Sequence, residues 1–254
     1  MASEKRFGYE WNKYDKIDSN YENQFKRWIF PLKPEDFKNK KVLDAGCGMG
    51  RNSLWALKYG SKELFAFDYD KRSVSVAKRN LSVFSNANVN FESIYKINYQ
   101  DKFDIAFCIG VIHHLKYPDL AISNLIKAVK QNGIILIWVY GYEGNEWINN
   151  IISPLRKYFF SKLPVFLLHF LSYLFSIPLY LFVKIFPQKS PYLKQVSGFK
   201  FAHLHSIVFD QLLPEIANYY KKEEAYQLLS KHNLKDIVIS HTNKNSWTIY
   251  GKKR

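Results

Sequence analysis

Three glycines at alternate positions, Gly46, Gly48 and Gly50, follow a short apolar run and precede a stretch that suits a helix. Glycine has no Cβ, so a loop built from it can turn sharply and bring its backbone close to a ligand. The next apolar run ends at Asp68. An acid about 20 residues after such a loop is where a doubly wound fold binds a ribose. The pattern therefore indicates an α/β sheet that binds a nucleoside-containing cofactor.

The spacing of the glycines excludes two other nucleotide sites. The dinucleotide fingerprint is Gly-x-Gly-x-x-Gly, and here the third glycine comes one residue too early. A phosphate-binding loop is excluded because no Gly-Lys-Ser or Gly-Lys-Thr follows.

The run Asp44-x-Gly-Cys-Gly-x-Gly-Arg51 resembles motif I of class I S-adenosylmethionine-dependent methyltransferases. The resemblance continues at the ends of the second and fourth expected strands and in the turn into the fifth. These matching segments are residues 67–70, 103–114 and 130–137. The resemblance implies S-adenosylmethionine as the cofactor and a methyltransferase activity.

The alternation of apolar runs and helical patterns predicts a parallel sheet covered on both faces. We expect strands near 41–45, 63–68, 88–93, 103–109 and 133–140, and helices near 51–59, 71–84 and 118–130. A helix at 221–232 and strands at 234–240 and 246–250 match the closing elements of the methyltransferase sheet. The predicted fold is α/β: a doubly wound, seven-stranded, mostly parallel, Rossmann-like sheet with a helical lid inserted between strands five and six.

This reading divides the chain into four parts. We expect an N-terminal aromatic arm at 1–38 and a cofactor-binding core at 39–144. A helical lid or substrate insert at 145–220 follows, and the C-terminal helix and hairpin at 221–254 complete the sheet. The arm either closes over the cofactor or packs on the lid, and the sequence leaves both open.

The insert contains a long apolar run, residues 158–186, within which 165–183 is long enough to suggest a transmembrane helix. Pro178 and His169 interrupt this run, and Lys162 and Lys184 bracket it. A span would also separate the closing hairpin from its sheet. We therefore predict two lid helices, broken near 176–178, that bury their faces on the core, on each other or in a homodimer. A helix lying on a membrane surface and a true span are the alternatives.

Charge and cysteine content limit the partners and the compartment. The chain has a formal net charge of +15, and residues 151–254 hold 15 Lys and Arg against 5 Asp and Glu. This excess favours a small anionic substrate or an acidic lipid surface. We expect nucleic acid to be an unlikely partner, because no base-methylation motif Asn/Asp-Pro-Pro-Tyr/Phe is present. The two cysteines and the absence of a secretory leader at the start indicate a cytoplasmic protein. The sequence contains neither Cys-x-x-Cys nor His-Glu-x-x-His, so no motif of this kind indicates a metal site.

The resemblance assigns roles to the cofactor-loop residues. Asp44 and Arg51 would hold the amino-acid end of S-adenosylmethionine, and Asp68 would bind its ribose hydroxyls. The adenine would contact Tyr69, and it would contact Ser93 only across a one-residue gap in the family pattern. The remaining expected cofactor contacts are Gly46, Cys47, Gly48, Ile109 and Gly110.

Histidines are the candidate bases, since an aliphatic hydroxyl must lose its proton during methylation and His titrates near neutral pH. His113 and His114 follow the fourth strand, and His205 is a further candidate. His203 and His205 alternate, so on a strand they would share one face, with Asp210 near enough to orient a histidine. The expected substrate-binding residues are Tyr9, Trp11, Tyr140, His203, Asp210 and Tyr219.

Residues 140–147, Tyr-Gly-Tyr-Glu-Gly-Asn-Glu-Trp, and the aromatic arm resemble a bacterial methyltransferase subgroup often associated with surface-carbohydrate or specialised-metabolite pathways. We therefore expect O-methylation of a small phosphorylated or nucleotide-linked intermediate of surface-polysaccharide assembly. One alternative is a lipid- or quinone-directed methyltransferase that uses its aromatic insert at the membrane. The other is a non-catalytic subunit that binds the cofactor.

Overall fold

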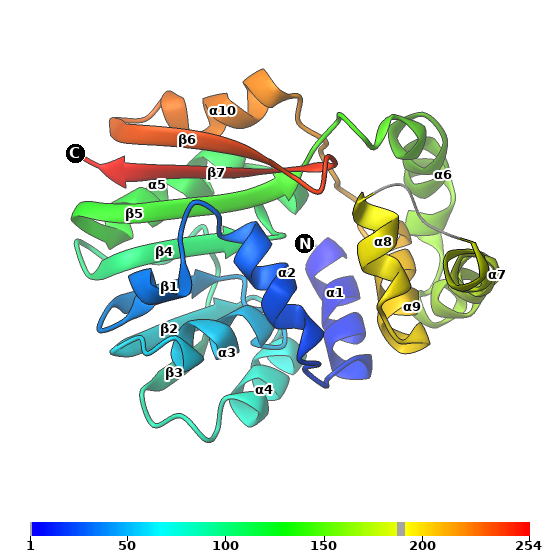
Figure 1. Ribbon diagram of the computed structural model, residues 1–254, viewed down its shortest axis with the longest axis horizontal. Helices are drawn as coiled ribbons and strands as arrows, with labels where there is room; N and C mark the ends of the chain where they lie inside the picture. The colour runs from blue at the N-terminus through cyan, green and yellow to red at the C-terminus, as the bar shows by residue number, and fades with distance from the viewer. Residues whose placement is uncertain (1, 187–190) are drawn as a thin grey trace.

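The computed structural model describes residues 2–186 and 191–254 and has a seven-stranded sheet in the order β3-β2-β1-β4-β5-β7-β6 (Figure 1). Strand β7 runs antiparallel to both of its neighbours, whereas β1 to β5 are joined by parallel pairs. The predicted fold is confirmed. The strands are β1 (Lys41–Ala45), β2 (Glu63–Asp68), β3 (Ala87–Phe91), β4 (Phe103–Ile109), β5 (Val129–Tyr140), β6 (Leu234–Thr242) and β7 (Ser246–Lys253).

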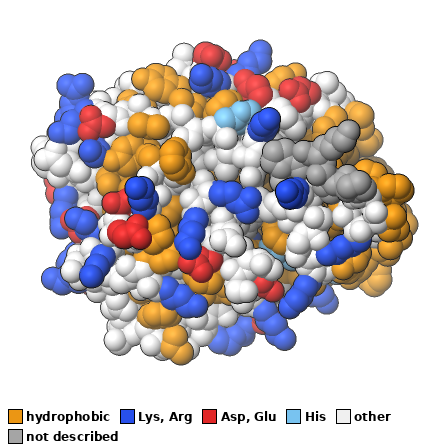
Figure 2. Space-filling view, viewed as in Figure 1, with side chains coloured by type: hydrophobic (Ala, Val, Ile, Leu, Met, Phe, Trp, Pro, Cys, Tyr) orange, Lys and Arg blue, Asp and Glu red, His pale blue; other side chains and the backbone are white. Residues whose placement is uncertain are grey.

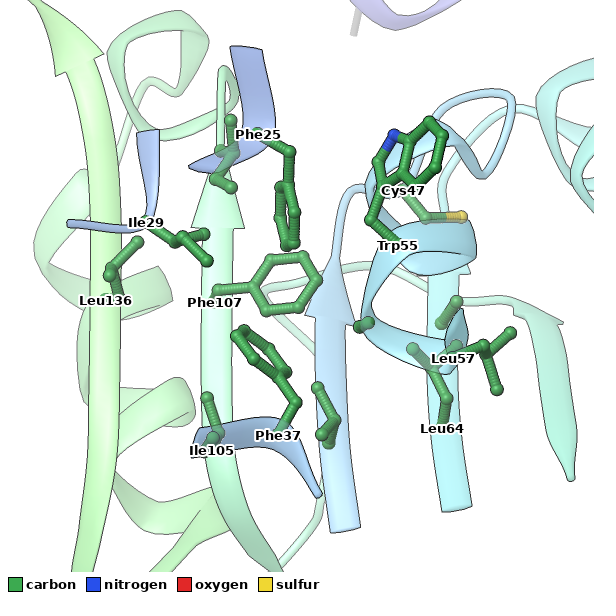
Figure 3. Close-up of a cluster of buried hydrophobic side chains, with 14 of the residues drawn as sticks. Phe25, Ile29, Phe37, Cys47, Trp55, Leu57, Leu64, Ile105, Phe107 and Leu136 are labelled. Atoms are coloured by element: carbon green, nitrogen blue, oxygen red, sulfur yellow. The ribbon is translucent and has the colours of Figure 1, made fainter. Parts of the chain in front are cut away.

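Helices cover both faces of the sheet because side chains alternate between the two faces along each central strand. On β4, Phe107 faces one layer and Cys108 faces the other. Phe107 packs against the rings of Phe25 and Phe37, at 5.7 and 6.3 Å between centroids (Figure 3). That layer is built from α2 (Asn20–Trp28), α3 (Arg51–Lys58) and α4 (Lys71–Asn80), and the other from α5 (Pro118–Ala128) and α10 (Lys222–Ser230).

A helical insertion separates β5 from β6 and lies at the carboxyl end of the parallel strands (Figure 1). It comprises a π-helical turn at Ile148–Ile152, α6 (Ser153–Tyr158), α7 (Val165–Ile185), α8 (Pro191–Ser197) and α9 (Phe201–Leu212). By length and composition alone, α7 could cross a membrane.

Two predictions within this insertion are wrong. The expected break near 176–178 does not occur, because α7 continues through Pro178. A proline removes one backbone hydrogen bond, and α7 is continuous across it while packing along α9. His203 and His205 lie on a helix rather than a strand. Two residues apart on a helix is about 200° of rotation, so the two rings face different neighbours.

The N-terminal helix α1 (Ala2–Lys13) packs between α4 and α9, beside the carboxyl ends of the strands (Figure 1). The buried guanidinium of Arg6 donates to the carbonyl oxygens of Leu213 (2.7 Å) and Phe160 (3.0 Å) in and after the insertion. Trp11 lies against the glycine loop on the opposite side. The arm therefore contacts both the cofactor loop and the insertion, which the sequence treated as alternatives.

Gly8 is the position at which α1 comes closest to the core. A Cβ at this position would overlap the carboxylate of Asp70, which caps α4 by accepting from the N–H groups of Arg72 (2.8 Å) and Ser73 (3.3 Å). We expect Gly8→Leu to displace α1 and to lower the free energy of unfolding by about 2 kcal/mol. Urea unfolding and the rate of tryptic cleavage at Lys13 measure this. Gly198→Leu is the control, because a Cβ there makes only ordinary contact. Equal stability of the two variants would contradict close packing at Gly8.

Candidate cofactor and acceptor site

The glycine loop follows β1 and is tied to the end of β2. The N–H groups of Gly46 and Cys47 both donate to the carbonyl oxygen of Phe67, each at 2.9 Å. Gly46, Gly48 and Gly50 have φ of 78°, 53° and 83°, in the left-handed region that favours glycine. A Cβ on Gly46 would also overlap Val111, from the loop after β4. The loop can therefore keep this shape only with glycine at these positions.

Asp68 ends β2 and faces the same loop. Its carboxylate accepts hydrogen bonds from the N–H groups of Gly48 and Asp70, both at 2.9 Å. Burial raises the pKa of Asp68, and the two hydrogen bonds lower it. Burial is the larger effect, and the resulting pKa is about 6. Across the loop, a Cβ on Gly110 would meet no atom of the described residues within 4 Å. Open space therefore borders the end of β4, and a buried acidic side chain ends β2, on the other side of β1.

Arg51, the first residue of α3, is enclosed by aromatic rings. Its guanidinium carbon lies 5.2 Å from the ring centre of Trp11, 5.0 Å from Tyr21 and 5.2 Å from Trp28. These rings come from α1 and α2, so the N-terminal arm holds the cation at the glycine loop. A Cβ on Gly48 would lie 3.0 Å from Nε1 of Trp11, which shows how closely the indole covers the loop.

A second group of polar side chains lies where β4 and β5 end. Nδ1 of His114 is 2.7 Å from the carbonyl oxygen of Ile216, and a carbonyl accepts only, so this nitrogen carries the proton. The Tyr140 hydroxyl donates to Asp210 (2.7 Å) on α9. Gln211 donates to Tyr140 (3.2 Å) and accepts from the hydroxyl of Tyr219 (2.9 Å). The insertion thus supplies part of the same hydrogen-bonded cluster as the sheet.

Both histidines after β4 are held in the neutral form. Burial lowers the pKa of His114 to about 4, and it lowers the pKa of His113 well below its ordinary value. The His113 ring stacks on Tyr140 with centroids 3.9 Å apart. Neither of its nitrogens has a hydrogen-bond partner among the described residues. His114 therefore has a fixed tautomer whose Nε2 is an unprotonated acceptor, the form that a general base requires.

Glu10 of α1 is a site residue that the sequence analysis missed. Its side chain is buried, and Oε2 has no hydrogen-bond partner within residues 2–186 and 191–254. Burial raises the pKa of Glu10 well above its ordinary value, the nearby charge of Asp210 raises it further, and Arg51 lowers it. Glu10 thus lies between the glycine loop and the polar cluster. A charged residue among Phe, Tyr and Trp in the arm was the only available signal.

Residues 36–148 match the family model of the methyltransferase domain. Two solved structures share the fold at low identity. Magnesium protoporphyrin IX methyltransferase from Synechocystis PCC 6803, solved with bound S-adenosylhomocysteine, has a TM-score of 0.56 and 13% identity, covering 95% of this chain and 87% of that one. An S-adenosylmethionine-dependent methyltransferase from Aquifex aeolicus has a TM-score of 0.52 and 14% identity, covering 94% and 100%. Residues 36–148 therefore match a methyltransferase domain, and the chain has the fold of class I methyltransferases.

The alignments with curated relatives cover only part of each relative's length. The tRNA U34 carboxymethyltransferase of Helicobacter pylori (strain Shi470) is 28% identical over 130 residues, 48% of this chain and 48% of that protein. The protein of the same name from Campylobacter hominis is 31% identical over 136 residues, 52% of this chain and 47% of that one. The chain therefore spans about half the length of the curated relatives that it matches.

The predicted domain family and cofactor are confirmed, and the site geometry fits S-adenosylmethionine. The open space beside Gly110 leaves room for a ligand at the end of β4, whereas Gly46 is packed against Val111. Asp68 would accept from the ribose hydroxyls, and Arg51 would pair with the carboxylate of the amino-acid end. When bound, the cofactor supplies an electrophilic methyl group. Of the other predicted contacts, Cys47 and Ile109 are buried beside this loop.

Several predicted site residues of the methyltransferase lie elsewhere. His205 faces α7, where Nδ1 lies 2.8 Å from the hydroxyl of Ser176 and Nε2 lies 3.4 Å from that of Ser172. Both nitrogens are thereby engaged inside the insertion, away from the glycine loop. His203 stacks on Phe199 at 3.8 Å between centroids, on the side of α9 toward α2. The prediction that His203 and His205 share one face is therefore wrong.

The aromatic residues of the arm divide between two roles. Tyr9 packs on the insertion, 6.1 Å from the ring of Phe209, whereas Trp11 covers the cofactor loop. Within the part of the chain that the structure describes, neither Tyr9 nor Trp11 makes a hydrogen bond or ring contact with the Tyr140 cluster. Asp210 belongs to that cluster, but its partner is Tyr140 rather than a histidine.

The two expected adenine contacts have local partners. Tyr69 is 42% exposed and stacks on Phe91 with centroids 5.4 Å apart. The Ser93 hydroxyl accepts from the N–H of Tyr95 (3.3 Å), within its own turn. Within residues 2–186 and 191–254, no cluster of three or more His, Cys, Asp or Glu side chains suits a metal ion.

Asp44 gives the methyltransferase a pH-dependent stability. Its buried carboxylate accepts from the hydroxyl of Ser53 (2.6 Å), and burial raises its pKa from 3.8 to about 7. The folded chain therefore keeps a proton here that the unfolded chain releases near pH 4. Stability is expected to fall as the pH rises, by about 2 kcal/mol between pH 5 and pH 7.

Urea unfolding of the wild type and Asp44→Asn at both pH values measures this contribution. The amide cannot ionise, so the fall should be about 2 kcal/mol smaller in the variant than in the wild type, and Asp68, whose pKa burial also raises, keeps its own contribution in both proteins. Asp119→Asn, at a side chain that is 62% exposed, should keep the wild-type profile. The same fall in all three proteins would rule out Asp44 as its origin.

Proposed function

We propose that this chain transfers a methyl group from S-adenosylmethionine to a hydroxyl group of a small molecule. The observation that carries the proposal is the polar cluster at the ends of β4 and β5. There His114 is neutral, its Nδ1–H is fixed by Ile216, and its Nε2 can accept a proton. A positioned base contributes about 10²–10⁴-fold, and a pKa near 4 places His114 at the lower end of this range.

The acceptor proposed here is a phosphorylated or nucleotide-linked intermediate of surface-polysaccharide assembly. The resemblance of residues 140–147 and the positive charge of residues 151–254 support this class. Inside the site, the carboxyl groups of Glu10 and Asp210 lie near guanidinium groups, and burial raises the pKa of both carboxyls. In this proposal Arg51 pairs with the carboxylate of the cofactor, so the phosphate of the acceptor lies toward the basic surface of residues 151–254 and its hydroxyl end enters the cluster. A cytoplasmic location is part of the proposal.

The test combines binding and turnover on the purified chain. S-Adenosylhomocysteine should raise thermal stability, by a few kcal/mol at about 100 times its Kd. Transfer of a labelled methyl group to a panel of phosphorylated sugars and nucleotide-linked metabolites then identifies the acceptor. Cofactor binding without transfer to any acceptor would favour the non-catalytic subunit, and no binding would contradict the whole proposal.

A tRNA acceptor is the second candidate. It is favoured by the names of the relatives, tRNA U34 carboxymethyltransferase, and by the formal net charge of +15. Against it stands the enclosure of the site by α1, which contacts both α4 and α9. Labelled product in tRNA but not in the metabolites would select this candidate. Its binding should then weaken steeply with salt, because phosphate contacts release counterions.

A further inference from the structure

Helix α7 buries three polar side chains together with Leu168 and Val183. The buried side chains that face α9 include His169, Ser172 and Ser176. The two serine hydroxyls lie within hydrogen-bond distance of His205, and the hydroxyl of Ser172 also donates to the His169 carbonyl (2.6 Å). A surface helix of a water-soluble domain shows the opposite arrangement, with its apolar stripe on the core and its polar side in water. The orientation of α7 therefore indicates an apolar environment on its outer side.

The outer side of α7 is a continuous apolar surface. Phe166, Phe170, Leu174, Leu181 and Ile185 are 61%, 70%, 69%, 52% and 68% exposed. We name this set the apolar insertion face. Figure 2 shows hydrophobic side chains gathered at the end of the molecule where Figure 1 places α7. Exposed apolar patches larger than a few hundred Å² mark interaction sites rather than ordinary surface.

The charge around this face has one sign. Residues 147–209 contain seven Lys and Arg and no Asp or Glu. Lys157 and Lys162 precede α7, and Lys184 lies in its last turn. Apolar and aromatic side chains beside lysines, without acids, match the interface of a bilayer that contains anionic lipids.

We propose that the apolar insertion face binds the surface of an anionic phospholipid bilayer, with α7 lying in the plane of the interface. A membrane-spanning α7 is disfavoured, because its serine and histidine side would have to leave α9 and enter hydrocarbon. A symmetric dimer through this face would bring the same lysines together without any acid to pair with them. The proposal goes beyond the methyl-transfer function and does not depend on which acceptor is used.

Vesicle flotation at low salt tests the proposal on the full chain. Vesicles of phosphatidylcholine with about one third phosphatidylglycerol should carry the protein upward, and pure phosphatidylcholine should carry much less of it. Phe170→Glu with Leu174→Glu should lower the vesicle partition coefficient at least ~10-fold, since two inserted apolar groups are lost. The matched control is Val83→Glu with Leu120→Glu, at side chains 82% and 48% exposed outside the insertion, and it should float like the wild type.

A second variant keeps the apolar face unchanged and alters only charge. Lys157→Gln with Lys162→Gln should weaken binding to the anionic vesicles about 25-fold, at about fivefold for each lysine, and leave the weaker binding to neutral vesicles unaffected. Stabilisation by S-adenosylhomocysteine in every variant checks that the fold and the cofactor site are intact, so a failure here is separable from a failure of the proposed function.

Three results would overturn the proposal. The first is an equal affinity of the wild type for both kinds of vesicle. The second is equal flotation of the Phe170/Leu174 variant and its control. The third is a wild-type dimer, seen by light scattering without lipid, that Phe170→Glu with Leu174→Glu dissociates while vesicle binding is absent. That last result would assign the face to a second copy of the chain.

Discussion

Replacing Asp68 with alanine is expected to weaken the binding of S-adenosylhomocysteine by about 100-fold. Each hydrogen bond to a charged acceptor contributes about 1.5–3 kcal/mol, and two ribose hydroxyls would lose theirs. The same carboxylate holds the N–H groups of Gly48 and Asp70, so the glycine loop also loses an anchor. Isothermal titration calorimetry at pH 7.5 measures the change in Kd.

The control and the pH dependence separate this role from a general loss of stability. Asp119→Ala removes an exposed carboxylate on α5 and should leave the Kd unchanged. The pKa of Asp68 is raised to about 6, so the wild type should lose affinity as the pH falls below about 6, where the carboxylate takes up a proton. The Asp68→Ala variant should show a flatter profile. Unchanged affinity in that variant would exclude Asp68 from the cofactor site.

The cofactor half of the site could be predicted because local sequence determines it. Three glycines in the left-handed region can only form a tight loop, and a carboxylate at the end of the next strand lies at the same sheet edge. Neither feature depends on how distant parts of the chain pack. This explains why β1, β2 and the loop between β1 and α3 were placed correctly.

The acceptor half could be predicted only in part, because it depends on packing between distant segments. Tyr140 and Asp210 were among the expected substrate-binding residues, whereas Glu10 was not. Glu10, Tyr140 and Asp210 are far apart in the sequence and meet only when α1 and α9 both pack at the ends of β4 and β5. Alternation of His203 and His205 fits a strand and a helix equally well over so few residues. The helix forms because α9 packs on α7, and this turns His205 toward Ser172 and Ser176.

The continuity of α7 has the same origin. The sequence rule that proline ends a helix rests on one lost hydrogen bond and a local clash. In this chain the contacts with α9 on both sides of Pro178, at Ser172, Ser176 and Val183, maintain the helix. The same packing places the hydroxyls of Ser172 and Ser176 against His205 on the inner side of α7. The continuity of α7 through Pro178 and the inward position of its serine side chains therefore both follow from the packing of α7 on α9.

Replacing His114 with asparagine is expected to lower kcat by about 10²-fold on the acceptor that the methyl-transfer panel identifies, the lower end of the range for a general base, because the pKa of His114 lies well below neutral pH. The asparagine amide can still donate to the carbonyl oxygen of Ile216, as Nδ1 of the histidine does at 2.7 Å, but it offers no basic nitrogen in place of Nε2. The affinity for S-adenosylhomocysteine should not change. The matched control is His241→Asn, which should retain the wild-type kcat. His241 lies on β6 and stacks on Trp247 of β7.

The pH profile distinguishes a base from a merely structural histidine. Because the pKa of His114 is lowered to about 4 by burial, Nε2 remains unprotonated across neutral pH. The wild-type kcat, measured with saturating cofactor and acceptor, should therefore stay constant from pH 8 down to about pH 5.5. An unperturbed histidine base would already lose most of its activity there, since it takes up a proton near pH 6.5. A kcat that falls with an apparent pKa near 6.5, or that survives His114→Asn, would assign the base to another residue.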